Sequence, residues 1–344
     1  MRPVKSLPPL FLALLASAPG CKQEAAPPPA APEAQLATDL PAPMIDTALR
    51  MIAASDGPRA ERIPGPSLGA GALVQTAAAK GGGDVRWDAE PYGAIGAARR
   101  GELLPMPDSG KDVPDLWRDP GGTWVAVGGR AEVMLVAVDL LGDRGAPVFY
   151  VALTQPWLKG KVALATPAGG ASLAHFAALY QAWGADRMQA WLSQMKANDV
   201  QVLESDDAVR QAVVTGKAIV GILSSDEAAK AAASAAHVLV IYPNQRSIGT
   251  FVWPTALFRP KDAPHPEAAK RLAERLASRE IEQLLVARVP GYLPLRPQIP
   301  VPPGVTSAAN LVVVSVDPGR IVSEIDRRKA ELTAWAESLK RRSR

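Results

Sequence analysis

The sequence predicts an α/β fold of two lobes, each built on a mostly parallel sheet flanked by helices. Short apolar runs that suit buried strands alternate along the chain with longer segments of helical periodicity. This alternation is typical of a mostly parallel sheet covered by helices on both faces. About 300 of the 344 residues follow this pattern without an internal repeat, which favours two lobes over one.

Each expected element rests on a local signal. The runs EVMLVAV and AIVGIL have the continuous apolar character of strands buried on both faces. A glycine turn at 81–83 precedes one strand, and Pro264 and Pro266 mark the start of a late helix. The expected strands are 84–87, 132–138, 161–165, 200–203, 218–223, 237–242 and 249–258. The expected helices are 44–54, 68–80, 92–100, 172–183, 185–196, 206–215, 226–236, 265–278 and 318–340.

Residues 1–20 have the features of a secretory signal peptide. A basic start is followed by an apolar stretch at 7–18, which is too short to span a membrane as a mature helix. Cleavage could follow the Ala-Ser-Ala at 16–18, or a lipobox-like Ala-Pro-Gly-Cys could make Cys21 the lipidated first residue. We favour lipidation, because the first cut would leave Pro19 at the cleavage site. As the single cysteine, Cys21 also excludes intramolecular disulfides and thiolate metal clusters.

The remaining chain divides into a tether and two lobes. Residues 21–43 are rich in proline and alanine and predict an extended, lipid-anchored tether. We expect 44–140 with 251–344 to form lobe 1 and 141–250 to form lobe 2. The crossings between the lobes are then expected near 140–148 and 246–251.

Composition and motifs exclude several classes of function. The net charge is +4, but basic residues crowd the two ends of the chain rather than a face or stripe, so we expect no nucleic-acid partner. The three histidines show no metal-pair spacing, and no G-x-S-x-G elbow or P-loop is present. Without a nucleophile and base pair, we expect neither an enzyme nor a bound cofactor.

Two polar turns follow expected strands, at the sheet edge where open α/β folds hold ligands. In the first, Gly169, Gly170 and Ser172 precede a helix whose N-terminus favours an oxyanion, although a plain turn capped by Ser172 is an equal alternative. In the second, Ser224, Ser225 and Asp226 offer hydroxyl and carboxylate oxygens, again with helix capping as the alternative.

Two further candidates lie near other strands. Trp87, Asp88 and Glu90 combine an aromatic face with two carboxylates, a set that suits a cation or an amine. Arg130 precedes the EVMLVAV strand and could pair with an anion or brace a crossover. If the site holds a metal ion, Glu90 and Asp226 are the candidate ligands.

From about residue 83 to 305, the order of segments resembles a known family. The pieces are GDVRWDAEPYG, GELLPMP, TWVAVGGRAEVMLVAVDLL, WLKGKVALATPAGG, VRQAVVTGKAIVGILSSDEA and APHPEAAKRLAERLASREIEQLL with YLPLRP after it. They resemble family 1 extracellular solute-binding proteins of ABC importers, of the ferric-iron-transporter type. The resemblance implies the two-lobed type II periplasmic-binding-protein fold with a ligand cleft between the lobes.

The resemblance also implies which residues face the ligand. Trp87, Asp88 and Glu90 would do so from lobe 1, and the turns at 169–172 and 224–227 from lobe 2. Two features depart from the family pattern. Ser224 and Ser225 stand where iron-binding members have neighbouring tyrosines, so phenolate coordination of Fe³⁺ is not expected. The segment 35–41 matches the family's first strand poorly.

The sequence therefore predicts an exported, lipid-anchored solute-binding protein on the periplasmic side of a bacterial membrane. It would capture a metal ion with an anion, or a small charged organic solute such as a phosphonate, a polyamine or thiamine. Its expected partners are an ABC permease and ATPase, and its expected state is a monomer. The alternative is a ligand-sensing or scaffolding lipoprotein that kept the fold and lost transport.

Overall fold

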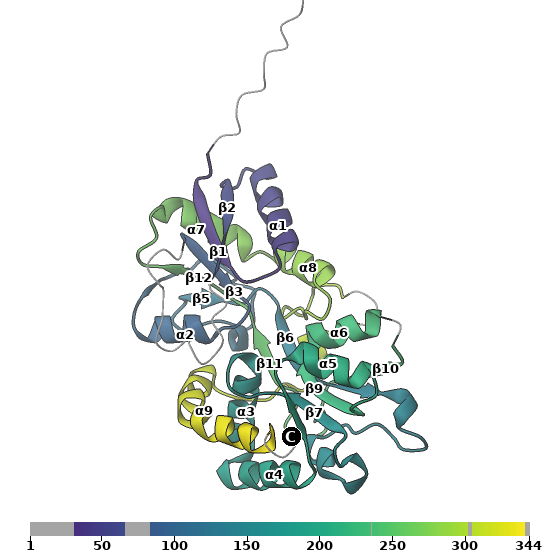
Figure 1. Ribbon diagram of the computed structural model, residues 1–344. Helices are drawn as coiled ribbons and strands as arrows, with labels where there is room; N and C mark the ends of the chain where they lie inside the picture. Colours follow the sequence, from purple (N-terminus) through teal and green to yellow (C-terminus); the bar gives the residue numbers. More distant parts are fainter. Residues whose placement is uncertain (1–30, 66–82, 235, 302–304, 341–344) are drawn as a thin grey trace, which may run out of the picture. The chain divides into compact units, whose positions relative to one another are not determined.

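The fold was analysed in a computed structural model, in which residues 31–65, 83–234, 236–301 and 305–340 are described. From residue 32 onward, the described residues form one compact unit. Cys21, the expected signal peptide, most of the expected tether and the expected helix at 68–80 lie outside the described residues. In the described part of the chain, two six-stranded sheets are flanked by helices (Figure 1).

The first sheet has the strand order β2-β1-β3-β12-β4, and β5 also pairs with β12. β1 runs parallel to β2 and β3, whereas β12 runs antiparallel to β3, β4 and β5. The strands are β1 (Ala34–Thr38), β2 (Ala60–Pro64), β3 (Val85–Asp88), β4 (Leu103–Leu104), β5 (Trp124–Val125) and β12 (Ala256–Pro260).

The second sheet has the strand order β10-β6-β9-β7-β8, and β11 also pairs with β6. β7 runs parallel to β8 and β9, whereas β6 runs antiparallel to β9, β10 and β11. The strands are β6 (Gly129–Ala137), β7 (Val162–Ala165), β8 (Gln201–Leu203), β9 (Val220–Ser224), β10 (Val238–Ile241) and β11 (Val252–Pro254).

The helices pack on the sheets and on one another. α7 contacts β12, α5 and α6 contact β9, and α9 lies against α3 (Figure 1). Among the described residues, no helix combines the length and apolar character needed to cross a membrane. The helices are α1 (Ala42–Ala54), α2 (Tyr92–Arg99), α3 (Gly170–Trp183), α4 (Ala185–Ala197), α5 (Asp206–Val214), α6 (Ser225–Ala233), α7 (Pro266–Leu276), α8 (Arg279–Arg288) and α9 (Pro318–Lys340).

The structure corrects the expected extent of the tether. Ala34–Thr38, expected within the tether, forms β1 between β2 and β3, and Leu36 in it is fully buried. AQLAT alternates small and apolar residues, but the proline-rich run before it led us to predict a tether here instead of a strand. Each sheet is mostly parallel, as expected, with one reversed strand: β12 runs against its neighbours in the first sheet, and β6 does so in the second.

The crossings between the sheets also differ from the expected positions. The chain leaves the first sheet after β5 and enters the second at β6, so the first crossing lies at 126–128 rather than at 140–148. It returns between β11 and β12, at Thr255 rather than at 246–251. The expected single strand at 249–258 is thus two strands, one in each sheet. Thr255 braces both crossings, because its hydroxyl donates to the Val127 carbonyl and accepts from the Val127 amide.

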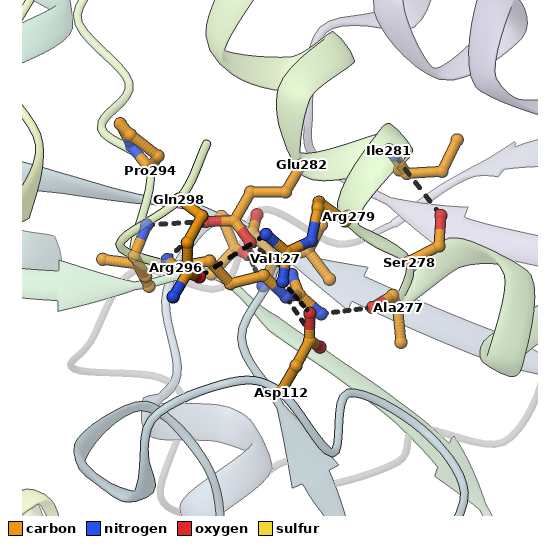
Figure 2. Close-up of polar contacts among 12 residues, drawn as sticks. Asp112, Val127, Ala277, Ser278, Arg279, Ile281, Glu282, Pro294, Arg296 and Gln298 are labelled. Atoms are coloured by element: carbon orange, nitrogen blue, oxygen red, sulfur yellow. Dashed lines mark hydrogen bonds and ion pairs between the residues drawn. The ribbon is translucent and has the colours of Figure 1, made fainter. Parts of the chain in front are cut away.

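A buried ion pair fixes the segment that follows α8 (Figure 2). Glu282 and Arg296 are both fully buried and paired with each other. Glu282 Oε1 also accepts hydrogen bonds from the amides of Leu295 at 2.6 Å and Arg296 at 3.2 Å. Leu293, just before this pair, forms a bridge to Gly129 at the start of β6. The ion pair therefore holds residues 291–295 against the junction of the two sheets.

Candidate functional site

The candidate site lies where the turn after β3 meets the turns of the second sheet. Glu90 belongs to the first turn, and its Oε1 accepts a hydrogen bond of 2.9 Å from the amide of Ala171 in the first turn of α3. Gly170 has a φ of +60°, and a Cβ there would lie 3.5 Å from Glu90 Oε1. A glycine at this position avoids the cost of a left-handed backbone. Glu90 thus joins the two halves of the site directly.

Arg130, the second residue of β6, lies at the centre of the site. Its Nη1 is 3.3 Å from Oδ2 of Asp226, and its Nη2 donates to the Ala89 carbonyl at 3.4 Å. The guanidinium carbon stands 5.2 Å from the ring centre of Trp253 and 5.5 Å from that of Tyr292. Both distances are within the range of a cation–π interaction. Arg130 is therefore held by a carboxylate, a carbonyl and two aromatic faces.

The N-terminus of α6 is pinned to the segment that follows α8. Ser225 Oγ donates to the Gly291 carbonyl at 2.6 Å and accepts from the Ala131 amide at 3.0 Å. Gly291 has a φ of +86°, and a Cβ there would lie 2.4 Å from Ser225 O and Asp226 Cα. Only glycine allows this approach of two backbones. The Ser225 hydroxyl is thus used to build the site.

Acidic groups outnumber the basic ones at this junction. Burial raises the pKa of Glu90 to about 7, against the opposing charge of Arg130. Burial also raises the pKa of Asp206, although that carboxylate accepts a hydrogen bond of 3.1 Å from the Ser224 amide. A raised pKa means that the surroundings do not balance the charge of the ionised carboxylate. The site therefore has unmet capacity for positive charge.

Two of the predicted site residues serve the first sheet instead. Trp87 is fully buried in the core, and its Nε1 donates to Thr255 Oγ1 at 3.0 Å. Asp88 is 6% exposed and pairs with Arg86 at 2.9 Å. Burial raises the pKa of Asp88 to about 7 even with this partner. The resemblance places both side chains at the ligand; in the structure Trp87 bonds to the crossing residue Thr255 and Asp88 to Arg86.

The other predicted residues divide between the site and its framework. Glu90, Arg130 and Asp226 come together, and Gly169 and Gly170 form the turn beside Glu90. Ser172 Oγ donates to the Ala165 carbonyl at 3.2 Å, which ties α3 back to β7. Ser224 is buried and offers its amide to Asp206.

Sequence reasoning missed Asp206, Trp253 and Tyr292. Asp206 begins α5, one residue after the Ser205 cap, so its acidic side chain was taken for an ordinary helix start. Tyr292 follows a helix that was not predicted as separate, α8. An aromatic residue directly after Gly291 in the YLPLRP segment was the available signal.

The described residues hold no group of three or more His, Cys, Asp or Glu side chains that could bind a metal ion. The metal candidates Glu90 and Asp226 are accordingly not part of such a group. A groove of about 640 Å³ lies elsewhere, between Arg99, Asp115 and Asp317. It does not involve the residues of the candidate site.

Residues 103–316 match the family described as bacterial extracellular solute-binding protein. The chain belongs to this family. Over 183 residues it is 27% identical to Iron uptake protein A1 of Synechocystis sp., with 51% of each chain covered. The chain thus spans about half the length of that curated relative.

The structure is similar to solved structures of the same kind. Iron-bound HitA from Pseudomonas aeruginosa gives a TM-score of 0.74 at 18% identity, covering 87% of this chain and 98% of that one. Ferric iron-binding protein A from Mannheimia haemolytica, in an open conformation, gives 0.72 at 19%, covering 90% and 99%. AfuA from Actinobacillus pleuropneumoniae, with fructose-6-phosphate bound, gives 0.71 at 18%, covering 89% and 98%.

These similarities establish the two-lobed periplasmic-binding-protein fold. The matched family is described as extracellular solute-binding, and the similar solved structures are of binding proteins. The predicted family and fold are confirmed, and the family supports a solute-binding role.

Proposed function

We propose that this protein captures a small charged solute at the cluster of Glu90, Arg130, Asp206 and Asp226 and delivers it to an ABC importer. The hydrogen bond from the Ala171 amide to Glu90 is the observation that carries this proposal. It joins the turn after β3 in the first sheet to the first turn of α3, which packs beside the second sheet. A solute held at this point would contact both halves of the molecule.

Capture would act by stabilising one arrangement of two lobes. In this proposal each sheet with its helices forms a lobe, and the lobes are joined at 126–128 and at Thr255. A solute that contacts both lobes favours the closed arrangement by its differential affinity for it. The permease would recognise the closed form, and no bond is made or broken.

The export and anchoring part of the proposal rests on the N-terminal sequence. Cys21 would carry the lipid, and the residues up to β1 would link the membrane to the folded unit. We expect a monomer on the periplasmic side of the membrane. The sensing or scaffolding alternative is favoured by the altered turn at Ser224 and Ser225 and by a poor match to the family's first strand; the presence of β1 removes only the second of these.

Several ligand classes follow from the relatives and from the site. The relatives carry names and ligands that point to ferric iron and, for AfuA, to a sugar phosphate. Ser224 and Ser225 replace the expected tyrosine pair, which argues against phenolate coordination of iron in this chain. A panel of solutes must therefore include ferric citrate, phosphate esters and cations.

A thermal-shift panel on residues 22–344 tests the proposal. A solute present at a hundred times its Kd adds about 2.7 kcal/mol to the free energy of unfolding, and so raises Tm by several degrees. Asp226→Asn should abolish this shift, whereas the control Asp139→Asn should keep it, because that side chain is 73% exposed and pairs with His237. If no solute shifts Tm, or if Asp226→Asn leaves the shift intact, the proposal is wrong.

A further inference from the structure

A buried carboxylate extends the candidate site inward. Glu132 lies two residues after Arg130 on β6, and alternate residues of a strand project from the same face. It is 3% exposed, and its register partner on β9 is Ser224. Within the described residues, its side chain makes one polar contact, at 3.6 Å from Nδ1 of His175. A fully buried glutamate with so little support is rare unless it has a role.

His175 does not neutralise Glu132. It is fully buried in α3, and burial lowers its pKa to about 3, so the ring is uncharged at neutral pH. Its ring stacks on Phe251 with centres 5.8 Å apart, and neither ring nitrogen has a hydrogen-bond partner in the described part of the chain. Burial raises the pKa of Glu132 well above its usual value, and the charge of Asp206 adds to this effect.

The charges around Glu132 are unbalanced. The groups whose charges act on its carboxyl are Asp206, Asp226 and Glu90, with Arg130 as the opposing cation. Arg130 is already paired with Asp226 and the Ala89 carbonyl. Among the described residues, Arg130 pairs with Asp226, whereas Glu90, Asp206 and Glu132 have no lysine or arginine within ion-pair distance, and a positively charged guest would restore the balance.

The candidate site also contains polar atoms without hydrogen-bond partners, and aromatic rings. Glu90 Oε2 and the hydroxyl of Tyr92 are covered and have no hydrogen-bond partner among the described residues. Burial raises the pKa of the Tyr92 hydroxyl, and the charges of Glu90 and Glu132 add to this effect. Carboxylate and hydroxyl oxygens can accept the N–H groups of an ammonium or guanidinium. Trp253, already against Arg130, offers an aromatic surface of the kind that favours cations.

We propose that the solute of this site is a small organic cation, an amine or a guanidine, and that Glu132 receives its positive charge. This inference rests on the proposed function and names its substrate class. An organic cation fits better than a metal ion, because the described residues hold no grouping of three metal ligands. A cation at Glu132 displaces the proton that the buried carboxyl holds, so affinity rises with pH.

Isothermal titration tests this with putrescine, L-arginine and choline as cationic probes, and with ferric citrate, inorganic phosphate and citrate as the alternatives. We expect at least one cationic probe to bind. Its affinity should fall by at least tenfold in Glu132→Gln and should rise between pH 6 and pH 8. Glu337→Gln, an exposed carboxylate on α9, is the matched control and should bind as the wild type does.

The outcomes separate this inference from the proposed function. If ferric citrate, phosphate or citrate binds and no cationic probe does, the proposed solute-binding function stands, but the inference that the solute is an organic cation is wrong. Cation binding that Glu132→Gln leaves unchanged would overturn the role of Glu132. If no probe binds, both proposals are wrong. Should Glu132→Gln fail to fold, Glu90→Gln at the partly buried rim provides the same comparison.

Discussion

The ion pair of Glu282 and Arg296 gives the sharpest test of how the site is held. Glu282→Ala removes the acceptor of two backbone amides and leaves the fully buried guanidinium of Arg296 with only the 45%-exposed Asp112 as its carboxylate partner. Breaking a buried pair from one side costs about 3–5 kcal/mol. The loss should also free residues 291–295, which contact β6 through Leu293 and α6 through Gly291. We therefore expect both lower stability and weaker solute binding.

Urea unfolding and thermal unfolding of residues 22–344 measure the first effect. A loss of 3–5 kcal/mol corresponds to a fall in Tm of roughly 5–8 °C for a chain of this size. Arg279→Ala is the control, because Arg279 lies at the exposed end of the same network and pairs with Asp112, itself 45% exposed. Such exposed pairs contribute about 0–1 kcal/mol. If Glu282→Ala loses no more stability than Arg279→Ala, the network does not hold this segment.

Three further changes test other parts of the structure. Asp88 has a pKa of about 7 in the folded state, against about 4 in the unfolded chain. Between these values the folded state keeps a proton that the unfolded chain has lost, so the contribution of Asp88 to the free energy of unfolding falls as pH rises from about 4 to about 7. Asp88→Asn should remove this contribution, seen as a flatter plot of urea midpoint against pH. Gly291→Ala should cost about 2–4 kcal/mol and weaken solute binding, because its Cβ would meet α6 backbone atoms that cannot move cheaply. Trp87→Phe should lower Tm, because the hydrogen bond to Thr255 is lost, and should leave the Kd of any solute unchanged. A changed Kd would show that Trp87 contacts the solute.

The fold could be predicted because its strands and helices carry strong local patterns. The run at 132–138 is apolar almost throughout and forms β6, and the amphipathic pattern at 318–340 forms α9 with the expected bounds. β1 and β2 were missed because AQLAT and AERIP are short and only partly apolar. Their burial depends on pairing with each other and with β3, which local sequence does not record.

The path of the chain between the sheets was harder to predict than the elements themselves. Both crossings occur within a few residues of apolar segments, so no polar linker marks them. The first follows β5 directly, and the second passes through a single residue, Thr255, between β11 and β12. Thr255 is fully buried and bonded to Val127 in the first crossing. A crossing stabilised in this way needs no glycine or proline, and so gives no signal in the sequence.

Polar residues next to a strand end were easier to propose for the site than an acid in the middle of an apolar strand. Glu90 and Asp226 were found by their position after β3 and at the start of α6, whereas Glu132 was read as part of an apolar strand. An ionisable group in such a strand is costly to bury, so a lone acid among apolar residues is itself a functional signal. The spacing strengthens it, because Arg130 and Glu132 project from one face of β6 and place opposite charges side by side. A solute that brings its own positive charge would explain why the strand keeps both.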